Sequence, residues 1–352
     1  MRVLSVVGAR PQFVKLAPIA AAMAGRAEHI VVHTGQHYDE LMSDVFFRDL
    51  GMPQPDVNLA IGSGAHGKQT GAMLAELEPV IERYQPDWVL VYGDTNSTLA
   101  AAVASVKLHV PLAHLEAGLR SFNRRMPEEH NRVLTDHAAD LLLAPTEVAM
   151  QHLAHEGLAD RSVLVGDVMT DVLYSVRDSV VARGAVTDPG AGYIATIHRP
   201  DNTDDPERLA AIVDALAGLD RPVRLLAHPR LVAAAEAARV DLQRGAIELA
   251  APLAYPDLVA AVMGSAGVVT DSGGLQKEAF LLRVPTTTVR PETEWVETVE
   301  LGWNVLVGSD LAALPAAVQR PRPPETDAAP YGDGHAAGRV VDVLAQRAAN
   351  RG

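Results

Sequence analysis

Three carboxylates lie within residues 87–132 at positions that favour chemistry. Asp94 and Glu116 each come just after a short apolar run, and Glu128 opens a helical pattern. Because ligands of an open parallel sheet bind outside the carboxyl ends of the strands, we expect Asp94 and Glu116 to face a substrate. Carboxylates in such a place can take up and release protons. Asp94 has a second interpretation, since an Asp before a helical pattern is also a common N-terminal cap.

Two cations follow the first predicted strand. The chain reads GARP after that strand, which includes Arg10, and Lys15 lies one turn into the helical pattern that comes next. Free N–H groups at a helix N-terminus attract anions, and Arg10 and Lys15 add positive charge there. The pattern indicates a phosphate or diphosphate site, and an ordinary strand-to-helix turn with two solvated cations explains it equally well.

Residues 269–278 read VTDSGGLQKE, which predicts a strand, a tight turn and a helix. Ser272 and the backbone of Gly273 and Gly274 are suited to surround a diphosphate, with the helix N-terminus behind them. Glu278 lies one turn along that helix, where a carboxylate can accept hydrogen bonds from ribose hydroxyl groups. The combination favours a nucleotide site over the alternative, a glycine-capped turn with a surface glutamate.

A histidine and an arginine end the strand that opens the second half of the chain. Residues 195–202 read ATIHRPDN, so His198 and Arg199 come just before a proline that prevents the strand from continuing. Such a pair can bind phosphate and move protons. His228 has the same kind of position after the next predicted strand, so one of the two histidines could have only a structural role.

Residues 62–69 read GSGAHGKQ and match two nucleotide-binding patterns in letters only. They fit G-x-G-x-x-G, and they fit the P-loop except that Gln69 replaces the Ser or Thr that binds magnesium. The segment before them contains Pro53 and Pro55 and does not predict a first core strand. We therefore expect a loop with a helix start near Lys68 rather than a nucleotide site.

The composition excludes several classes of protein. The chain has 352 residues, a formal net charge of −14 and no basic run, which argues against nucleic acid or a membrane surface as partner. It has no cysteine, and no histidine spacing is typical of a metal site. No apolar run is long enough for a membrane helix or fits a signal peptide. We expect a soluble, cytoplasmic protein, and nothing in the composition indicates a metal site or a cofactor.

Short apolar runs alternate with helical patterns along the chain, which predicts βαβ units and parallel sheets. Twelve runs are predicted strands: residues 3–7, 29–33, 88–92, 110–115, 141–144, 162–165, 193–197, 223–227, 247–250, 267–270, 284–289 and 304–307. Because most sheets have about 4–6 strands, these fit two doubly wound, Rossmann-like α/β domains better than one sheet. We expect residues 1–168 plus a C-terminal helix at 335–352 to form one domain and residues 169–334 the other, with a cleft between them.

Seven segments, in this order, resemble motifs of the non-hydrolysing UDP-N-acetylglucosamine 2-epimerases: GARPQFVKLAP, TGQHYDELMSDVFF, VYGDTNSTLA, HLEAGLRS, MPEEHNR, TIHRPDN and TDSGGLQKEA. The resemblance covers residues 1–308 and implies two domains like those of GT-B glycosyltransferases, a homodimer and a UDP-sugar substrate. It also implies reversible epimerisation of UDP-GlcNAc at C2 to UDP-ManNAc, by anti elimination of UDP through a 2-acetamidoglucal and re-addition.

The resemblance assigns roles to the residues introduced above. Asp94, Glu116 and Glu128 match the catalytic carboxylates, and His198 matches the active-site histidine. The residues that match contacts to the nucleotide sugar are Arg10, Lys15, Tyr255, Ser272, Gly273, Gly274 and Glu278. Three carboxylates close together would raise one another's pKa values toward the operating pH, as proton transfer requires.

Three other segments, GSGAHGKQT, HRPDN and RPETEWVETVE, are more similar to the branch that includes epimerases of UDP-2,3-diacetamido-glucuronic acid. Only Gln36 and His37 fit the allosteric pattern of some bacterial members. The substituents at C3 and C6 of the sugar and the allosteric behaviour are therefore open. A hydrolysing 2-epimerase and a GT-B glycosyltransferase are alternative enzymes, and a nucleotide-binding module built on residues 62–68 is an alternative without catalysis.

Overall fold

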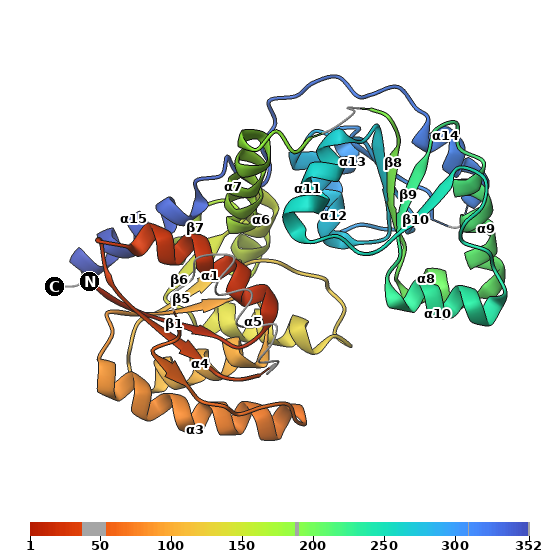
Figure 1. Cartoon of the computed structure of the whole chain (residues 1–352). Coiled ribbons are helices and arrows are strands. Elements are labelled where there is room, and N and C mark those ends of the chain that lie inside the picture. Colours follow the sequence, from red (N-terminus) through yellow and green to blue (C-terminus); the bar gives the residue numbers. More distant parts are fainter. Residues whose placement is uncertain (37–53, 187–189, 309, 351–352) are drawn as a thin grey trace. The chain divides into compact units, whose positions relative to one another are not determined.

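The computed structural model describes residues 1–36, 54–186, 190–308 and 310–350 (Figure 1). The chain forms two compact units. Unit 1 comprises Met1–Val172 and Ala329–Gly352, and unit 2 comprises Leu173–Ala328. The chain therefore leaves unit 1, builds unit 2 and returns to unit 1 at its C-terminal end.

Unit 1 is built on a seven-stranded sheet with the order β3-β2-β1-β4-β5-β6-β7, in which neighbouring strands pair in parallel. The strands are β1 (Arg2–Val7), β2 (Glu28–His33), β3 (Val57–Asn58), β4 (Trp88–Tyr92), β5 (Leu112–Leu115), β6 (Leu141–Ala144) and β7 (Ser162–Leu164). The strand order reverses between β1 and β4. A doubly wound sheet binds its ligand at the carboxyl ends of the strands at such a reversal.

Helices cover both faces of the unit 1 sheet, as apolar strands of a parallel sheet require. On one face the strands pack with α1 and α15, and on the other with α3, α4 and α6. In Figure 1, α3 and α4 lie below the sheet, and α1 and α15 lie above it. The helices are α1 (Arg10–Met23), α3 (His66–Tyr84), α4 (Asn96–Lys107), α5 (Pro127–Ala138), α6 (Glu147–His155), η1 (Ala159–Arg161) and α15 (Ala336–Ala349). Helix α7 (Val168–Ala182) begins in unit 1 and continues into unit 2.

The last helix is fastened to unit 1 at both its ends. The Asp171 carboxylate accepts hydrogen bonds from the N–H groups of Ala336 and Ala337, at 3.0 and 2.8 Å, and so caps the start of α15. The Trp88 indole N–H donates to the Leu344 carbonyl at 3.1 Å near its end. The buried apolar side of α15 completes the core above the sheet.

Unit 2 is a second doubly wound unit with a six-stranded parallel sheet, in the order β10-β9-β8-β11-β12-β13. Its strands are β8 (Tyr193–Thr196), β9 (Val223–Leu226), β10 (Ile247–Ala250), β11 (Gly267–Thr270), β12 (Thr286–Thr288) and β13 (Asn304–Leu306). Its helices are α8 (Pro200–Thr203), α9 (Pro206–Ala217), α10 (Pro229–Ala238), α11 (Tyr255–Gly264), α12 (Gly273–Leu281), α13 (Val296–Glu300), η2 (Leu311–Ala313) and α14 (Leu314–Val318). Residues of α9, α10 and α14 cover one face of the sheet, and residues of α11 and α12 cover the other. The strand order reverses between β8 and β11.

All twelve predicted strands are present, and the α/β class with two doubly wound sheets is confirmed. Five strands, β7, β8, β9, β12 and β13, end one residue earlier than the apolar run. Two strands, β5 and β12, begin two residues later than it. The prediction missed β3, which has two residues and lies at the sheet edge in a proline-rich segment. Edge strands of this kind carry little hydrophobic signal.

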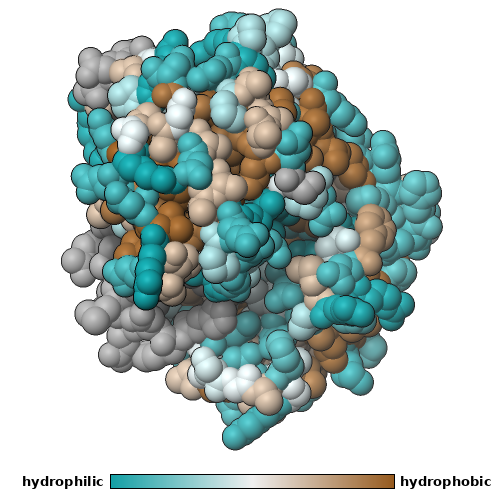
Figure 2. Space-filling view, turned by 90° about the vertical axis from the view of Figure 1, so that its right-hand side faces the viewer, coloured by the Kyte–Doolittle hydropathy of each residue, from teal (hydrophilic) through white to brown (hydrophobic). Residues whose placement is uncertain are grey.

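Figure 2 shows one face of the molecule, on which hydrophilic residues are in the majority and hydrophobic residues are exposed between them. Among the described residues, no helix is long and apolar enough to cross a membrane. This finding concerns only membrane-spanning helices, and the expectation that no membrane surface is a partner stays a prediction.

Candidate functional site

Glu116 lies directly after β5 and forms an ion pair with Lys15 of α1. Both side chains are largely buried, with exposed fractions of 10% and 16%. Burial alone would lower the pKa of Lys15, but the Glu116 carboxylate outweighs it and holds that pKa above its ordinary value. Glu116 also has a φ of 68°, a left-handed conformation that non-glycine residues seldom adopt and that concentrates at functional sites.

Asp94 lies two residues after β4 and pairs with Arg132 of α5, with 2.5 Å between Asp94 Oδ2 and the Arg132 guanidinium. The Asn131 amide donates to the Asp94 carbonyl at 2.9 Å, so α5 holds this turn through two adjacent residues. The other interpretation of Asp94, as a helix cap, is wrong. Thr95 is the cap of α4, and its side chain accepts from the Thr98 N–H.

The turns that carry Asp94 and Glu116 lie against each other. A Cβ placed on Gly93 would lie 3.3 Å from Glu116 Oε2 and 3.5 Å from Lys15 Nζ. The structure therefore brings these two predicted carboxylates into one cluster at the carboxyl edge of the sheet. Each has a cation beside it, a feature that the sequence did not predict.

The third predicted carboxylate, Glu128, is exposed in the first turn of α5. Its neighbour Glu129 is buried and accepts hydrogen bonds from the N–H groups of Ser121 and Phe122, at 2.9 and 2.8 Å. Burial raises the pKa of Glu129, but these N–H donors and Arg132 outweigh it and hold that pKa below its ordinary value. Glu129 thus fixes the loop before α5 and leaves Glu128 open to a ligand.

The N-terminus of α1 differs from the sequence-based expectation of free N–H groups. The N–H groups of Gly8 and Ala9 donate to the Gln12 side chain at 2.8 and 3.0 Å. The Gln12 amide in turn donates to the Tyr92 carbonyl at 2.8 Å. Arg10 is the first residue of α1, and its side chain lies outside the part of the chain that the structure describes.

In unit 2, His198 lies just after β8 and is oriented by Asp271, which lies just after β11. His198 Nδ1 lies 3.0 Å from Asp271 Oδ1, and the fully buried carboxylate also accepts from the N–H groups of His198 and Arg199 and from the Asn202 amide. Burial raises the pKa of Asp271, but His198 and the other donors outweigh it and keep that pKa low. With Nδ1–H directed at a carboxylate, a neutral His198 ring has its proton-accepting nitrogen at Nε2.

Ser272 caps α12 at the reversal of strand order, between β8 and β11. Its hydroxyl makes no capping hydrogen bond to α12, so it is free to contact an anion at this helix N-terminus. A Cβ at Gly273 would lie 2.2 Å from Glu294 Oε1, whereas a Cβ at Gly274 would meet no atom within 4 Å. Gly273 lies against the Glu294 carboxylate, and Gly274 faces open space that a ligand can occupy.

The last two predicted contacts are joined to each other. The Tyr255 hydroxyl, in the first turn of α11, donates to Glu278 Oε1 at 3.0 Å. Burial raises the pKa of Tyr255, and the Glu278 carboxylate raises it further, so the phenol keeps its proton. Glu278 is thereby held in place on α12, one turn beyond Gly274.

A cavity of about 390 Å³ lies beside the turn after β8 and is lined by three arginines, Arg199, Arg208 and Arg290. The Arg208 guanidinium is held by the Asn202 side chain and the Gly308 carbonyl, at 2.8 and 2.7 Å. Two carboxylates, Asp201 and Glu292, also line this cavity, and Arg290 pairs with Glu294 at 2.9 Å. The positive charge of the three arginines is therefore largely balanced.

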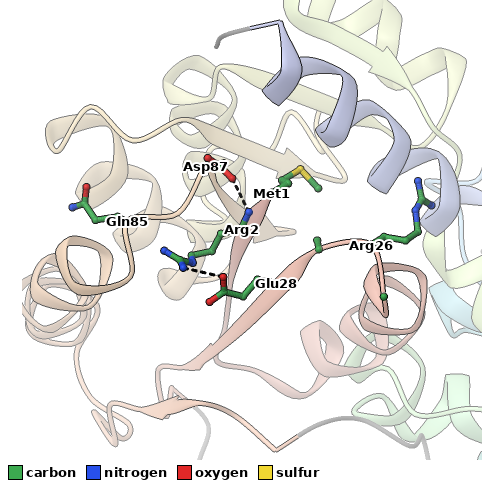
Figure 3. Close-up of a pocket in the computed structure, with 8 residues that line it drawn as sticks. Met1, Arg2, Arg26, Glu28, Gln85 and Asp87 are labelled. Atoms are coloured by element: carbon green, nitrogen blue, oxygen red, sulfur yellow. Dashed lines mark hydrogen bonds and ion pairs between the residues drawn. The ribbon is translucent and has the colours of Figure 1, made fainter.

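Three other regions have structural roles or lie away from the site. His228 caps α10 by accepting from the Arg230 N–H. Gln69, which stood in the P-loop-like segment, is buried and donates to the Gly62 carbonyl at 2.7 Å, so it holds the loop rather than a nucleotide. A hollow of about 540 Å³ at Arg2 lies at the opposite, amino-terminal edge of the unit 1 sheet (Figure 3).

The two doubly wound units define a GT-B-like α/β protein, and comparison with known proteins identifies the family. The family model of UDP-N-acetylglucosamine 2-epimerase matches residues 20–345, so the chain belongs to this family. A Pseudomonas aeruginosa protein named UDP-2,3-diacetamido-2,3-dideoxy-D-glucuronate 2-epimerase is 45% identical, over 98% of this chain and 100% of that protein.

Solved structures agree with the family. The crystal structure of Methanocaldococcus jannaschii UDP-GlcNAc 2-epimerase in complex with UDP-GlcNAc and UDP has a TM-score of 0.80 at 37% identity, covering 98% of this chain and 100% of that one. The structure of UDP-GlcNAc 2-epimerase from Neisseria meningitidis bound to UDP-GlcNAc has a TM-score of 0.82 at 26% identity, with the same coverage.

The sequence did not predict the residues that fix the predicted site residues, or the turns that carry them, through hydrogen bonds and ion pairs. These are Gln12, His114, Arg120, Glu129, Asn131, Arg132, Asp136 and Asp271, and most of them lie inside the segments that carry the resemblance. A polar residue within an otherwise apolar strand, such as His114 in β5, was an available signal. His37, the other half of the allosteric pattern, lies outside the described residues.

Proposed function

We propose that this protein is a non-hydrolysing epimerase that interconverts UDP-GlcNAc and UDP-ManNAc at C2 of the sugar. The observation that carries the proposal is the cluster of Asp94 and Glu116, each paired with a cation, at the strand-order reversal of a chain that belongs to this family. The glycine turn and the oriented His198 at the corresponding reversal of unit 2 support it.

The chemistry follows from the position of the stereocentre. C2 of the sugar is not next to a carbonyl, so its proton cannot be removed by simple enolisation. A base removes the C2 proton, the C–H electrons form the C1=C2 bond, and the C1–O electrons leave with UDP. The resulting 2-acetamidoglucal is protonated at C2 from the opposite face, and UDP adds back to C1. Every atom is recovered, and no redox partner is needed.

The residues of the chain divide these tasks. We assign proton exchange at C2 to Asp94, Glu116 and Glu128, because carboxylates are effective general acids and bases when they contact the transferred proton. We assign the leaving diphosphate to Arg10, Lys15 and His198, which can balance the charge that develops on it. Contacts to UDP come from Tyr255, Ser272, Gly273, Gly274 and Glu278.

A direct test is incubation of the purified protein with UDP-GlcNAc, followed by phosphorus and proton NMR. A stable mixture of two UDP-sugars is expected, and steady accumulation of free UDP with ManNAc would instead show a hydrolysing enzyme. The variants Asp94→Asn, Glu116→Gln and Glu128→Gln should each lose most turnover. If all three kept it, a reaction of another class, such as glycosyl transfer to an acceptor, would replace this proposal.

A second candidate substrate is a UDP-2,3-diacetamido-glucuronate, which the 45% identical relative is named for. Such a sugar carries a carboxylate at C6, which a guanidinium group binds well. Arg199 lines the 390 Å³ cavity of unit 2, although the carboxylates of Asp201 and Glu292 line it too. Side-by-side kinetics with both UDP-sugars separate the candidates. A kcat/KM at least about 100-fold higher for the uronate would identify it as the substrate.

We further propose that the protein is a cytoplasmic homodimer. The family resemblance supports the dimer, and the absence of cysteine suits a reducing compartment. Light scattering after size-exclusion chromatography should give twice the mass of one chain, and a monomer would contradict the proposal. Cell fractionation tests the location.

A further inference from the structure

A buried histidine lies beneath the turn that carries Asp94. His114 projects from β5, and its side chain is 1% exposed. Its Nδ1 lies 2.6 Å from the Asp136 carboxylate of α5, and its Nε2 lies 2.7 Å from the carbonyl of Gly93. His114 therefore ties the residue next to Asp94 to a helix that packs on the sheet.

The same aspartate holds the turn that carries Glu116. The second oxygen of Asp136 accepts from the N–H of Gly118, two residues after Glu116, at 3.0 Å. It also pairs with the buried Arg120 guanidinium at 2.7 Å, and Arg120 in turn forms two 2.8 Å hydrogen bonds with Glu156. One carboxylate thus connects the two catalytic turns through a chain of short contacts.

The hydrogen-bond pattern holds the ring of His114 on both sides. Both ring nitrogens face acceptors, the Gly93 carbonyl and the Asp136 carboxylate. Burial raises the pKa of Asp136, but His114 and Arg120 outweigh it and hold that pKa below its ordinary value. The Arg120 guanidinium lies between the two carboxylates of the network, Asp136 and Glu156.

The network restrains backbone that would not hold its conformation unaided. Glu116 has its left-handed φ of 68°, and Gly118 has a φ of 82° in a place where a Cβ would lie 2.4 Å from the Ala149 carbonyl. At Glu116 this conformation is strained and persists only where the surroundings fix it, whereas a glycine adopts it freely. The contact from Gly118 to Asp136 restrains the chain two residues after Glu116.

We propose that His114 and Asp136 are positioning residues that hold the Asp94 and Glu116 turns at a fixed separation during proton exchange at C2. The reaction named in this inference is the one in the proposed function, whereas the contacts of His114 and Asp136 do not depend on that proposal. Both side chains are buried, with exposed fractions of 1% and 0%. A buried network in which every member has partners suits this task, because it fixes the turns before the reaction begins.

The main test compares His114→Gln with His137→Gln. His137 is a matched control, because it contacts Glu156 at the half-exposed outer end of the same network at 3.2 Å. A glutamine at position 114 cannot donate to both Asp136 and Gly93 in the ring geometry. We expect kcat for the UDP-sugar to fall about 100-fold, as misplacement by about 1 Å does, while KM stays within about threefold. His137→Gln should behave as the parent protein. A kcat for folded His114→Gln within about threefold of the parent would overturn the proposal.

Two further measurements do not depend on activity. Hydrogen exchange should accelerate in His114→Gln at residues 93–95 and 116–118 and stay unchanged in unit 2; unchanged exchange at both turns would contradict the positioning role. In the parent protein, proton NMR should show a slowly exchanging ring N–H of His114, held by its contacts to Asp136 and Gly93, and Asp136→Asn should accelerate its exchange. A rapidly exchanging ring N–H in the parent would overturn the positioning role even if neither variant folds. If the parent epimerises neither UDP-sugar, the proposed function fails and these two measurements still decide the inference.

Discussion

Each unit buries an aspartate against a histidine, but only one of the two histidines is open to a ligand. In unit 1, His114 is 1% exposed, and both of its ring nitrogens are engaged, by Asp136 and by Gly93. In unit 2, the His198 side chain is 38% exposed, and Asp271 engages its Nδ1. The two pairs share their residue types and their place at the carboxyl edge of a doubly wound sheet.

The difference lies in the second ring nitrogen. A histidine with both ring nitrogens engaged is saturated and can only hold its neighbours. A histidine with one nitrogen fixed by a carboxylate is oriented, and its other nitrogen can exchange a proton with a ligand. The comparison predicts that a change at His198 lowers the rate directly, because its free ring nitrogen faces a ligand. A change at His114 should lower the rate indirectly, because it destabilises the fold and moves the Asp94 and Glu116 turns.

The largest expected effect comes from His198→Gln. Loss of a group that stabilises the charge on the leaving diphosphate lowers kcat by about 10²–10³-fold. The free energy of unfolding should fall by only about 1 kcal/mol, because Asp271 keeps the N–H groups of His198 and Arg199 and the Asn202 amide as donors. In contrast, His114→Gln should lose about 1.5–3 kcal/mol of stability, because it removes hydrogen bonds to a charged group. Steady-state kinetics and urea denaturation measure both variants. Equal losses of stability in the two variants would contradict the distinction between the partly exposed His198–Asp271 pair and the buried His114–Asp136 pair.

The two aspartates should be alike in stability. Asp136→Asn and Asp271→Asn each leave buried donors without their charged partner, so each should lower the free energy of unfolding by about 3–5 kcal/mol. Asp178→Asn is the control, since Asp178 is exposed and its pair with Arg177 lies at the surface, where ion pairs contribute less than about 1 kcal/mol. Chemical denaturation measures the free energy of unfolding of each variant. A loss in Asp136→Asn or Asp271→Asn as small as that in Asp178→Asn would show that the charge of the buried aspartate does not hold its turn in place.

A third histidine gives unit 1 a dependence on pH. Burial lowers the pKa of His29 from 6.5 to about 4, and its Nε2 lies 2.8 Å from Ser5 Oγ. As the pH falls below 6.5, the unfolded chain binds this proton before the folded protein does. Stability is therefore full above pH 6.5 and declines toward pH 4, by at most about 3 kcal/mol from this residue. His29→Gln should flatten the decline measured by urea unfolding at a series of pH values, and an unchanged slope would refute the assignment.

The smallest effect on the fold is expected at Gly274. A Cβ there meets no protein atom within 4 Å, so Gly274→Ala should leave stability unchanged or raise it by up to about 1 kcal/mol. Binding of UDP, measured by calorimetry, should weaken at least about tenfold if the diphosphate lies against this turn. Gly71 of α3 is the matched control, because it is also helical and open. If Gly274→Ala binds UDP as tightly as the parent protein, the diphosphate does not lie against this turn.

The sequence predicted the fold better than it predicted the contacts of the candidate site residues. Apolar runs identified twelve strands, since buried parallel strands are almost continuously hydrophobic. Asp94, Glu116 and His198 lie just after strands, as expected, and their roles stay predictions. The partners of these residues come from distant segments: Lys15 reaches Glu116 from α1, and Asp271 reaches His198 from another strand end.

Such pairings depend on how the strands are ordered in the sheet, which local patterns do not contain. The expectation that N–H groups at the start of α1 are free was wrong for a similar reason. The side chain of Gln12, three residues after Ala9, turns back and accepts a hydrogen bond from the Ala9 N–H. The saturated ring of His114 likewise became visible only when Gly93 and Asp136 were placed beside it.

Proton NMR in deuterated water tests the central claim most directly. The protein is incubated with UDP-GlcNAc and, separately, with the UDP-2,3-diacetamido-glucuronate. If C2 is inverted through loss and return of its proton, the product of the accepted substrate carries deuterium at C2, and both epimers appear with UDP still attached. A product that keeps protium at C2 throughout would contradict the proposed mechanism, and the absence of a second epimer from both UDP-sugars would contradict the proposed function.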